Sequence, residues 1–139
     1  MDGINQYLFV YGTLLENDNE FAAYLVENSG FYGRGKVGGK LYDMGKYPGI
    51  ILNPNDNHFV YGNIYFMADP EGLLKMLDYY EGFGENEAHP NEFVRKLTTI
   101  ESSGKLLEGW VYEYNLPVDE LTLIISGDYL IYMEELTKE

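Results

Sequence analysis

A short apolar strand near the N-terminus, closed by a glycine, most strongly constrains the fold of this 139-residue chain. Leu8 to Tyr11 is an aromatic and β-branched run, which is typical of a strand buried on both faces. Gly12 follows at once and can bring bare backbone close to a ligand. The run predicts a core strand followed by a turn. A second interpretation stays open, in which backbone N–H groups at the end of the strand form a small anion-binding nest.

Composition places the chain among globular proteins and limits its partners. Hydrophobic residues make up 45% and aromatic residues 16%, so residues 1–139 are expected to form a single domain. The net charge of −14 argues against nucleic acid or an anionic membrane as a partner, because too few basic residues are present to neutralise phosphates. The absence of cysteine excludes disulfides, thiolate catalysis and cysteine-based zinc sites. No signal peptide or long apolar span is evident, and we expect a cytoplasmic protein.

Strand patterns outnumber helix patterns and mostly follow one another through short turns. Capping residues and apolar faces predict one helix of about ten residues ending at Asn28, another from Pro70 to Glu81, and a third in the tail 126–139. The predicted strands, after the first, are 31–42, 50–52, 59–67, 93–101 and 105–115, the last two joined by a hairpin turn at 102–104. This order predicts an α+β fold, with a curled, mainly antiparallel β-sheet or barrel and a few packed helices.

Few residues are available for metal or acid–base chemistry. His58 and His89 are the only histidines, and both lie in polar loop sequence, so a histidine metal cluster or a Ser-His-Asp triad has little material. No glycine-rich phosphate-binding loop of standard spacing is present. Proton transfer would therefore fall to a carboxylate or a tyrosine.

Glu81 differs by its context from most of the 23 acidic residues. It follows Leu77 and Tyr80 on the aromatic side of a predicted helix, and Gly82 comes next. The helix dipole disfavours an anion at this end, and tyrosines lie nearby, so we expect a raised pKa that suits proton transfer near neutral pH. A solvated surface glutamate is the alternative interpretation.

Short motifs along the chain occur in the order found in a known protein family. They are Phe9-Val10-Tyr11-Gly12-Thr13-Leu14, the segment 41–50 with Tyr47-Pro48-Gly49, Tyr61-Gly62-Asn63-Ile64-Tyr65, Leu77-Asp78-Tyr79-Tyr80-Glu81-Gly82, and Ser126-Gly127-Asp128-Tyr129. Each motif alone is unspecific, but together they span almost the whole chain. On these motifs the sequence resembles the gamma-glutamylcyclotransferase-like family, in its AIG2-like and gamma-glutamylamine cyclotransferase branch.

The resemblance implies an enzyme that releases 5-oxoproline from a γ-glutamyl amine or amino acid. The α-amine of the γ-glutamyl group attacks its own γ-carbonyl and expels the attached amine, helped by the high effective molarity of intramolecular attack. By the family pattern, Glu81 is the catalytic general acid and base. The resemblance implies no metal and no cofactor. It also assigns substrate binding and oxyanion stabilisation, through backbone N–H groups, to the loop of Tyr11, Gly12, Thr13 and Leu14.

The sequence departs from the family pattern around the acidic loop 83–92. Many members have Tyr-x-Arg after this loop, whereas this chain has Phe93-Val94-Arg95, and Arg95 is expected either to bind a carboxylate or to pair with a surface acid. The loop itself is longer and more acidic than the family pattern and is expected to set substrate preference. Two other functions stay open, a non-catalytic module that binds an amino-acid-like ligand and an acidic protein-interaction domain. The sequence determines neither the leaving amine nor the oligomeric state.

Overall fold

The computed structural model describes residues 4–12 and 20–137. None of the helices in this part of the chain has the length and hydropathy that a membrane crossing requires. The predicted helices and the longer predicted strands are all present, with ends shifted by a few residues. In chain order the elements are β1 (Tyr7–Val10), α1 (Glu20–Glu27), β2 (Ser29–Asp43), β3 (Pro48–Leu52), β4 (Phe59–Met67), α2 (Pro70–Glu81), β5 (Phe93–Ser102), β6 (Lys105–Tyr114), β7 (Thr122–Leu123) and α3 (Tyr129–Thr137).

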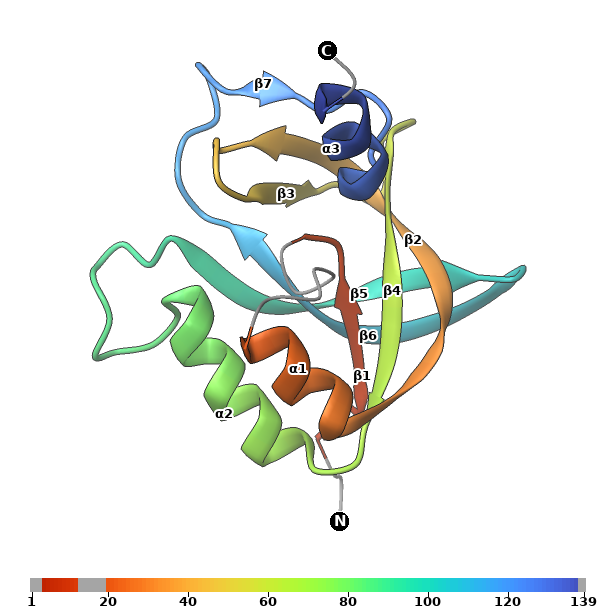
Figure 1. The fold of residues 1–139 in the computed structure, drawn as a ribbon, viewed down its shortest axis with the longest axis vertical. Helices are drawn as coiled ribbons and strands as arrows, with labels where there is room; N and C mark the ends of the chain where they lie inside the picture. The colour runs from red at the N-terminus through yellow and green to blue at the C-terminus, as the bar shows by residue number, and fades with distance from the viewer. Residues whose placement is uncertain (1–3, 13–19, 138–139) are drawn as a thin grey trace.

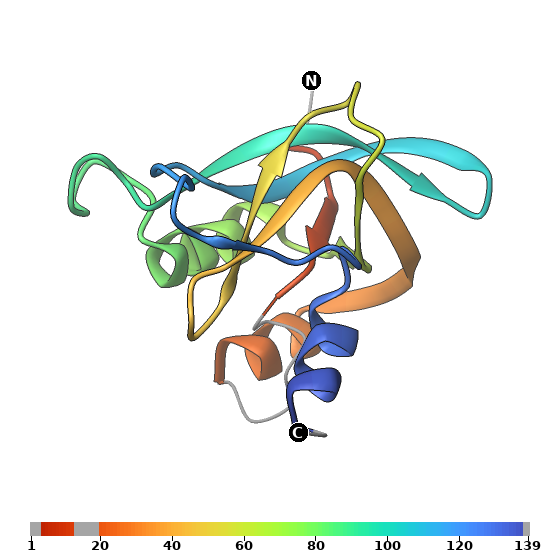
Figure 2. The same ribbon diagram turned by 90° about the horizontal axis from the view of Figure 1, so that it is seen from above.

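The strands form a curved sheet that closes into a barrel (Figure 1). Around the ring the order is β1, β4, β2, β3 and β6, and β6 returns to pair with β1. Most pairings are antiparallel, but β6 runs parallel to β1, where Leu8 pairs with Trp110, and parallel to β3. β5 forms a long antiparallel hairpin with β6 that extends to one side of the barrel (Figure 2). The predicted curled, mainly antiparallel sheet with a few packed helices is confirmed.

β1 joins two hydrophobic cores because its side chains alternate between its faces. Leu8 and Val10 pack with residues of α1 and α2, including Leu25 and Leu77. Phe9 and the adjacent Tyr11 point the other way, into the barrel. There they meet side chains from the other strands and from α3, namely Val37, Leu41, Ile50, Val60, Ile64, Ile100, Val111, Ile124 and Tyr129. Burial of the first strand on both faces, as predicted, is confirmed.

The sequence defines helix α2 at both ends. The Asp69 side chain caps the first turn by accepting a hydrogen bond from Gly72 N at 3.2 Å, and Gly82 ends the helix in the left-handed conformation. The sequence predicts an apolar stripe of Leu73, Met76, Leu77 and Tyr80 on this helix. The prediction is wrong at Met76, which is 40% exposed, because the adjacent leucines already cover the face that meets the sheet. The buried residues of α2 are Leu73, Leu74 and Leu77. Glu81 follows Leu77 by one helical turn.

Two parts of the sheet differ from the predicted pattern. β2 begins two residues earlier than predicted and pairs with β4 along most of its length, with an irregular step between Phe31 and Gly33. β7 lies in the segment 116–125, for which the sequence predicts only a connection to the tail, and it pairs with Tyr42 and Asp43 of β2. Figure 1 shows α3 at the end of the molecule opposite to α1 and α2. There Tyr132 donates a hydrogen bond to Asp43 Oδ2 at 2.6 Å.

Candidate active site

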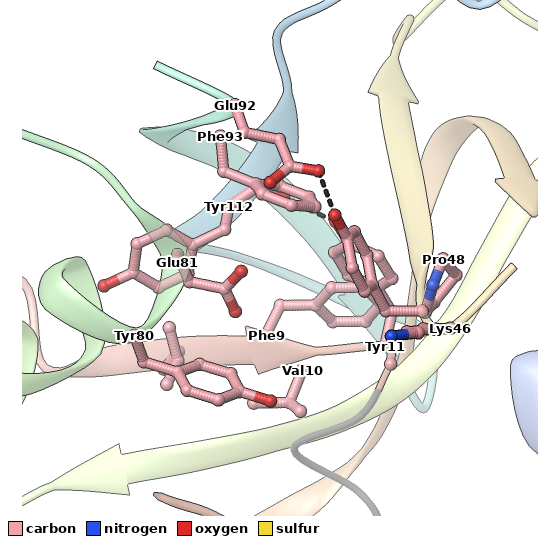
Figure 3. Close-up of a pocket in the computed structure, with 13 residues that line it drawn as sticks. Phe9, Val10, Tyr11, Lys46, Pro48, Tyr80, Glu81, Glu92, Phe93 and Tyr112 are labelled. Carbon is pink, nitrogen blue, oxygen red and sulfur yellow. Dashed lines mark hydrogen bonds between the residues drawn. The ribbon is translucent and has the colours of Figure 1, made fainter. Parts of the chain in front are cut away.

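A cavity of about 330 Å³ lies where the end of β1 meets the last turn of α2 (Figure 3). Its size lies at the lower end of the range usual for small-molecule pockets. The remaining walls come from the segment before β3, the start of β5 and the middle of β6. The lining residues are Leu8, Phe9, Val10, Tyr11, Gly12, Lys46, Tyr47, Pro48, Tyr80, Glu81, Glu92, Phe93 and Tyr112.

Glu81 is the last residue of α2, and its carboxyl group points into this cavity (Figure 3). Burial, and secondly the negative charge of Glu92, raise the pKa of Glu81 to about 8. The predicted raised pKa is therefore confirmed, although its main causes differ from the helix dipole and the tyrosines invoked from sequence. A carboxyl group with this pKa can both accept and donate a proton near neutral pH.

The predicted substrate loop reaches the same cavity as far as Gly12. The Tyr11 hydroxyl donates to Tyr112 O at 2.6 Å and accepts from Ile50 N at 3.2 Å, so this side chain ties β1 to β6 and β3. Burial, followed by the charge of Glu81, raises the pKa of Tyr11 well above its usual value. Thr13 and Leu14 lie outside the described residues.

Gly12 lies against the ring of Pro48, which begins β3. A Cβ atom added at Gly12 would lie 2.8 Å from Pro48 Cγ, closer than a real side chain tolerates. Glycine is therefore needed here for close approach of the two segments. The contact brings bare backbone to the edge of the cavity.

Glu92 is a cavity residue that the sequence analysis did not identify individually. It immediately precedes β5, and its carboxylate accepts a hydrogen bond from the Tyr47 hydroxyl (Figure 3). Burial, followed by this hydrogen bond, raises the pKa of Tyr47. The sequence pointed to the acidic loop 83–92 as a determinant of substrate preference. The loop contains several glutamates of similar local sequence, so the sequence alone does not single out Glu92.

Sequence comparison assigns nearly the whole chain to a single family. The family described as "Gamma-glutamyl cyclotransferase, AIG2-like" matches residues 8–131. The chain belongs to this family. It is 37% identical over 130 residues to a protein of Methanocaldococcus jannaschii that is provisionally named a gamma-glutamylcyclotransferase, covering 91% of this chain and 98% of that protein. The resemblance seen in the motifs is thus confirmed.

A second relative and a solved structure are also similar to this chain. Gamma-L-glutamyl-butirosin B gamma-glutamyl cyclotransferase of Niallia circulans is 35% identical over 109 residues, which is 78% of this chain and 66% of that protein. The crystal structure of an AIG2-like protein from Mus musculus has the same fold, with a TM-score of 0.69 and 24% identity over 89% of this chain and 87% of that one. The prediction of an enzyme of the gamma-glutamylcyclotransferase type is confirmed at the level of the family.

Asp78 belongs to the same cyclotransferase motif as Glu81, and it binds Arg95, whose role the sequence left open. Arg95 Nε lies 2.7 Å from Asp78 Oδ1, and a second hydrogen bond joins Nη2 to Oδ2 at 3.1 Å. The guanidinium group also stacks 4.4 Å from the ring centroid of Trp110. Arg95 therefore pairs with an acid of the protein, and it lines a different cavity from the one that contains Glu81.

Within residues 4–12 and 20–137, no three histidine, aspartate or glutamate side chains lie close enough together to hold a metal ion. Metal-independence of the reaction stays a prediction.

Proposed function

We propose that this protein converts a γ-glutamyl amine or amino acid into 5-oxoproline and a free amine, with Glu81 as general acid and base. The observation that carries the proposal is the Glu81 carboxyl group, with a pKa raised to about 8, in one cavity with the bare backbone of Gly12. A bond forms between the α-nitrogen and the γ-carbonyl carbon, and the bond from that carbon to the leaving nitrogen breaks. No oxidation or reduction takes place.

Proton transfer is the chemistry that the protein supplies. The α-amine of a γ-glutamyl group is an ammonium at neutral pH and must lose a proton before its nitrogen can attack. Glu81, as a carboxylate, takes that proton and then returns it to the nitrogen of the departing amine. The raised pKa of Glu81 lies closer to the pKa of an ammonium group than an ordinary carboxyl pKa does. Both proton transfers therefore have small free-energy differences.

The cavity walls support a folded substrate conformation. Phe9, Val10 and Phe93 contribute apolar surface and are each at most 5% exposed. A small cavity favours the conformer in which the α-amine approaches the γ-carbonyl. The high effective molarity of intramolecular attack then lowers the barrier to ring closure. Backbone N–H groups from Gly12 onward would stabilise the negative charge that develops on the γ-carbonyl oxygen.

The leaving amine is tested with a substrate panel. The panel contains γ-glutamyl dipeptides, glutathione, γ-glutamyl-alkylamines and a larger γ-glutamyl amide, because one relative is named for γ-L-glutamyl-butirosin B. We expect 5-oxoproline release from at least one of them, measured by chromatography. The matched α-glutamyl dipeptides, which share composition but place the amide on the wrong carbonyl, should release none. Binding of γ-glutamyl compounds without any 5-oxoproline would overturn the proposal and leave a non-catalytic binding module.

A further inference from the structure

Glu92 is a second cavity carboxylate, and the surrounding structure fixes its position. Its side chain accepts the Tyr47 hydrogen bond, and its main-chain oxygen accepts another from Asn115 N at 2.7 Å. The neighbouring Phe93 is 5% exposed, and its ring centroid lies 5.9 Å from that of Tyr47. Glu92 is therefore anchored at both its backbone and its side chain, unlike a glutamate on an open loop.

Glu81 and Glu92 reach the cavity from different elements, α2 and the residue before β5 (Figure 3). Apolar side chains of β1 and β5 form much of the wall around them. Two negative charges in such a cavity repel each other more strongly than in water, because the surroundings screen them poorly. Burial already favours the neutral form of Glu81, and the negative charge of Glu92 adds to this preference, so Glu81 holds a proton when no ligand is bound.

Apart from Glu92, the polar side chains that line the cavity with Glu81 are tyrosines and one lysine, so none of them supplies a second carboxylate charge. They are Tyr11 from β1, Lys46 and Tyr47 from the segment before β3, Tyr80 from α2 and Tyr112 from β6. Tyr11 donates its hydroxyl proton to a main-chain oxygen, and Tyr112 donates to Asp78. Lys46 is the only basic residue among those described around the cavity, and its exposed position at the rim allows water and salt to screen its charge.

We propose that Glu92, fixed by Tyr47, is a positioning residue that keeps a proton on Glu81 in the free enzyme until the substrate ammonium arrives. This proposal rests on the proposed function. When the ammonium enters the cavity, its positive charge offsets the repulsion between the two carboxyl groups. Glu81 then releases its proton to solvent and becomes the base that the α-amine needs. The substrate thus activates the catalytic base on binding.

The first test follows the Glu81 carboxyl group directly. Protein labelled with ¹³C at the glutamate side-chain carboxyl is titrated by NMR, and the Glu81 resonance is assigned by its loss in Glu81→Gln. We expect a midpoint near pH 8 in the unmodified protein, the value to which the pKa of Glu81 is raised. In Glu92→Gln the midpoint should fall by about one pH unit, since one like charge is removed. An unchanged midpoint would overturn the proposal.

Two further variants separate the charge of Glu92 from general effects of the acidic loop. Glu85→Gln removes the same charge from the same loop, but Glu85 lines a different cavity, so the Glu81 midpoint should stay in place. Tyr47→Phe releases the Glu92 carboxylate and should lower the midpoint by less than Glu92→Gln does. An equal shift in Glu85→Gln, or no shift in Tyr47→Phe, would contradict the assigned roles. Tyr47→Phe also provides the test if Glu92→Gln does not fold.

Kinetics test the role of the substrate. The pH dependence of kcat/KM reports groups in the free enzyme, whereas that of kcat reports the enzyme–substrate complex. In the unmodified enzyme we expect kcat to fall on the acid side at a lower pH than kcat/KM does. In Glu92→Gln the difference between these two pH values should be smaller. Coinciding pH values in the unmodified enzyme would overturn activation by substrate. If no substrate in the panel turns over, the proposed function fails, while the NMR titration still decides whether Glu92 controls Glu81.

Discussion

The Tyr112 hydroxyl lies 2.7 Å from Asp78 Oδ1, in the α2 turn that precedes Glu81. The same aspartate accepts the hydrogen bonds from Arg95, so β5 and β6 hold the end of α2 through one carboxylate. Tyr112 also lines the cavity and accepts the Tyr11 hydrogen bond through its main-chain oxygen. The position of the helix end that carries Glu81 and the closure of the barrel are thus linked at one residue, Tyr112.

Tyr112→Phe should reduce stability while preserving the fold. The variant removes a hydrogen bond to a charged acceptor and leaves the Asp78–Arg95 pair in place, so we expect a loss of about 1–2 kcal/mol in the free energy of unfolding. Urea denaturation measures this loss. Tyr79→Phe is the matched control, because Tyr79 is 67% exposed, and it should change stability little. Equal effects of the two substitutions would contradict a specific role for the Tyr112–Asp78 bond.

Glu81→Gln should abolish turnover without weakening the fold. The amide retains the shape of the side chain but cannot accept the ammonium proton, and general acid–base groups contribute about 10²–10⁴-fold to rate. Because one residue serves both transfers, the loss should reach the upper end of that range. Release of 5-oxoproline and the melting temperature are measured on the same sample. Turnover near the unmodified level would remove Glu81 from the mechanism.

The stability of the protein should depend on pH through Glu81. Its pKa is raised in the folded state to about 8 from an ordinary value of 4.5, so the folded state binds more protons between these values than the unfolded state does. Stability from this group is complete below pH 4.5 and is lost as pH rises through about 8. Glu81→Gln should therefore gain roughly 2–4 kcal/mol relative to the unmodified protein between pH 5 and pH 9. Denaturation curves at both pH values check this, and a constant difference would contradict it.

Gly12→Ala should impair both packing and substrate binding. The added methyl group would press on Pro48, and such overpacking typically costs about 1–3 kcal/mol. Because Gly12 lines the cavity, we also expect a higher KM on any substrate that the panel identifies. Gly30→Ala serves as the control, since nothing lies within 4 Å of a Cβ added there. A Gly12→Ala variant with unchanged KM would place the substrate away from the end of β1.

Activity should survive removal of divalent metal ions. The proposed mechanism uses a carboxyl group and backbone N–H groups, and neither requires a Lewis acid. Turnover is compared before and after dialysis against EDTA, with Mg²⁺, Mn²⁺ and Zn²⁺ added back separately. Loss of turnover that a single ion restores would argue against this mechanism.

Local sequence patterns predicted the parts of this fold that local chemistry determines. The caps of α2 and the burial of β1 on both faces follow from neighbouring residues. The direction of the Glu81 pKa shift was also expected, but its causes are burial and the charge of Glu92, which only the folded chain brings near Glu81. The pairing of Arg95 with Asp78 could not be predicted from local sequence, because Asp78 reaches Arg95 only after α2 packs beside β5. Glu92 was missed for the same reason, since only the contact with Tyr47 distinguishes it from Glu85 and Glu87. β7 was not predicted from the sequence, because a strand this short is defined only by its pairing with β2.

The hydrogen bond from Tyr11 to Tyr112 joins residues 101 positions apart in the chain. Closing the loop between these two residues costs conformational entropy. During synthesis β1 leaves the ribosome before its partner β6. The edge of β1 that pairs with β6 therefore has no partner until β6 has been made. Only then can the cavity that holds Glu81 form, so a chain cut before β6 would lack both the closed barrel and the candidate site.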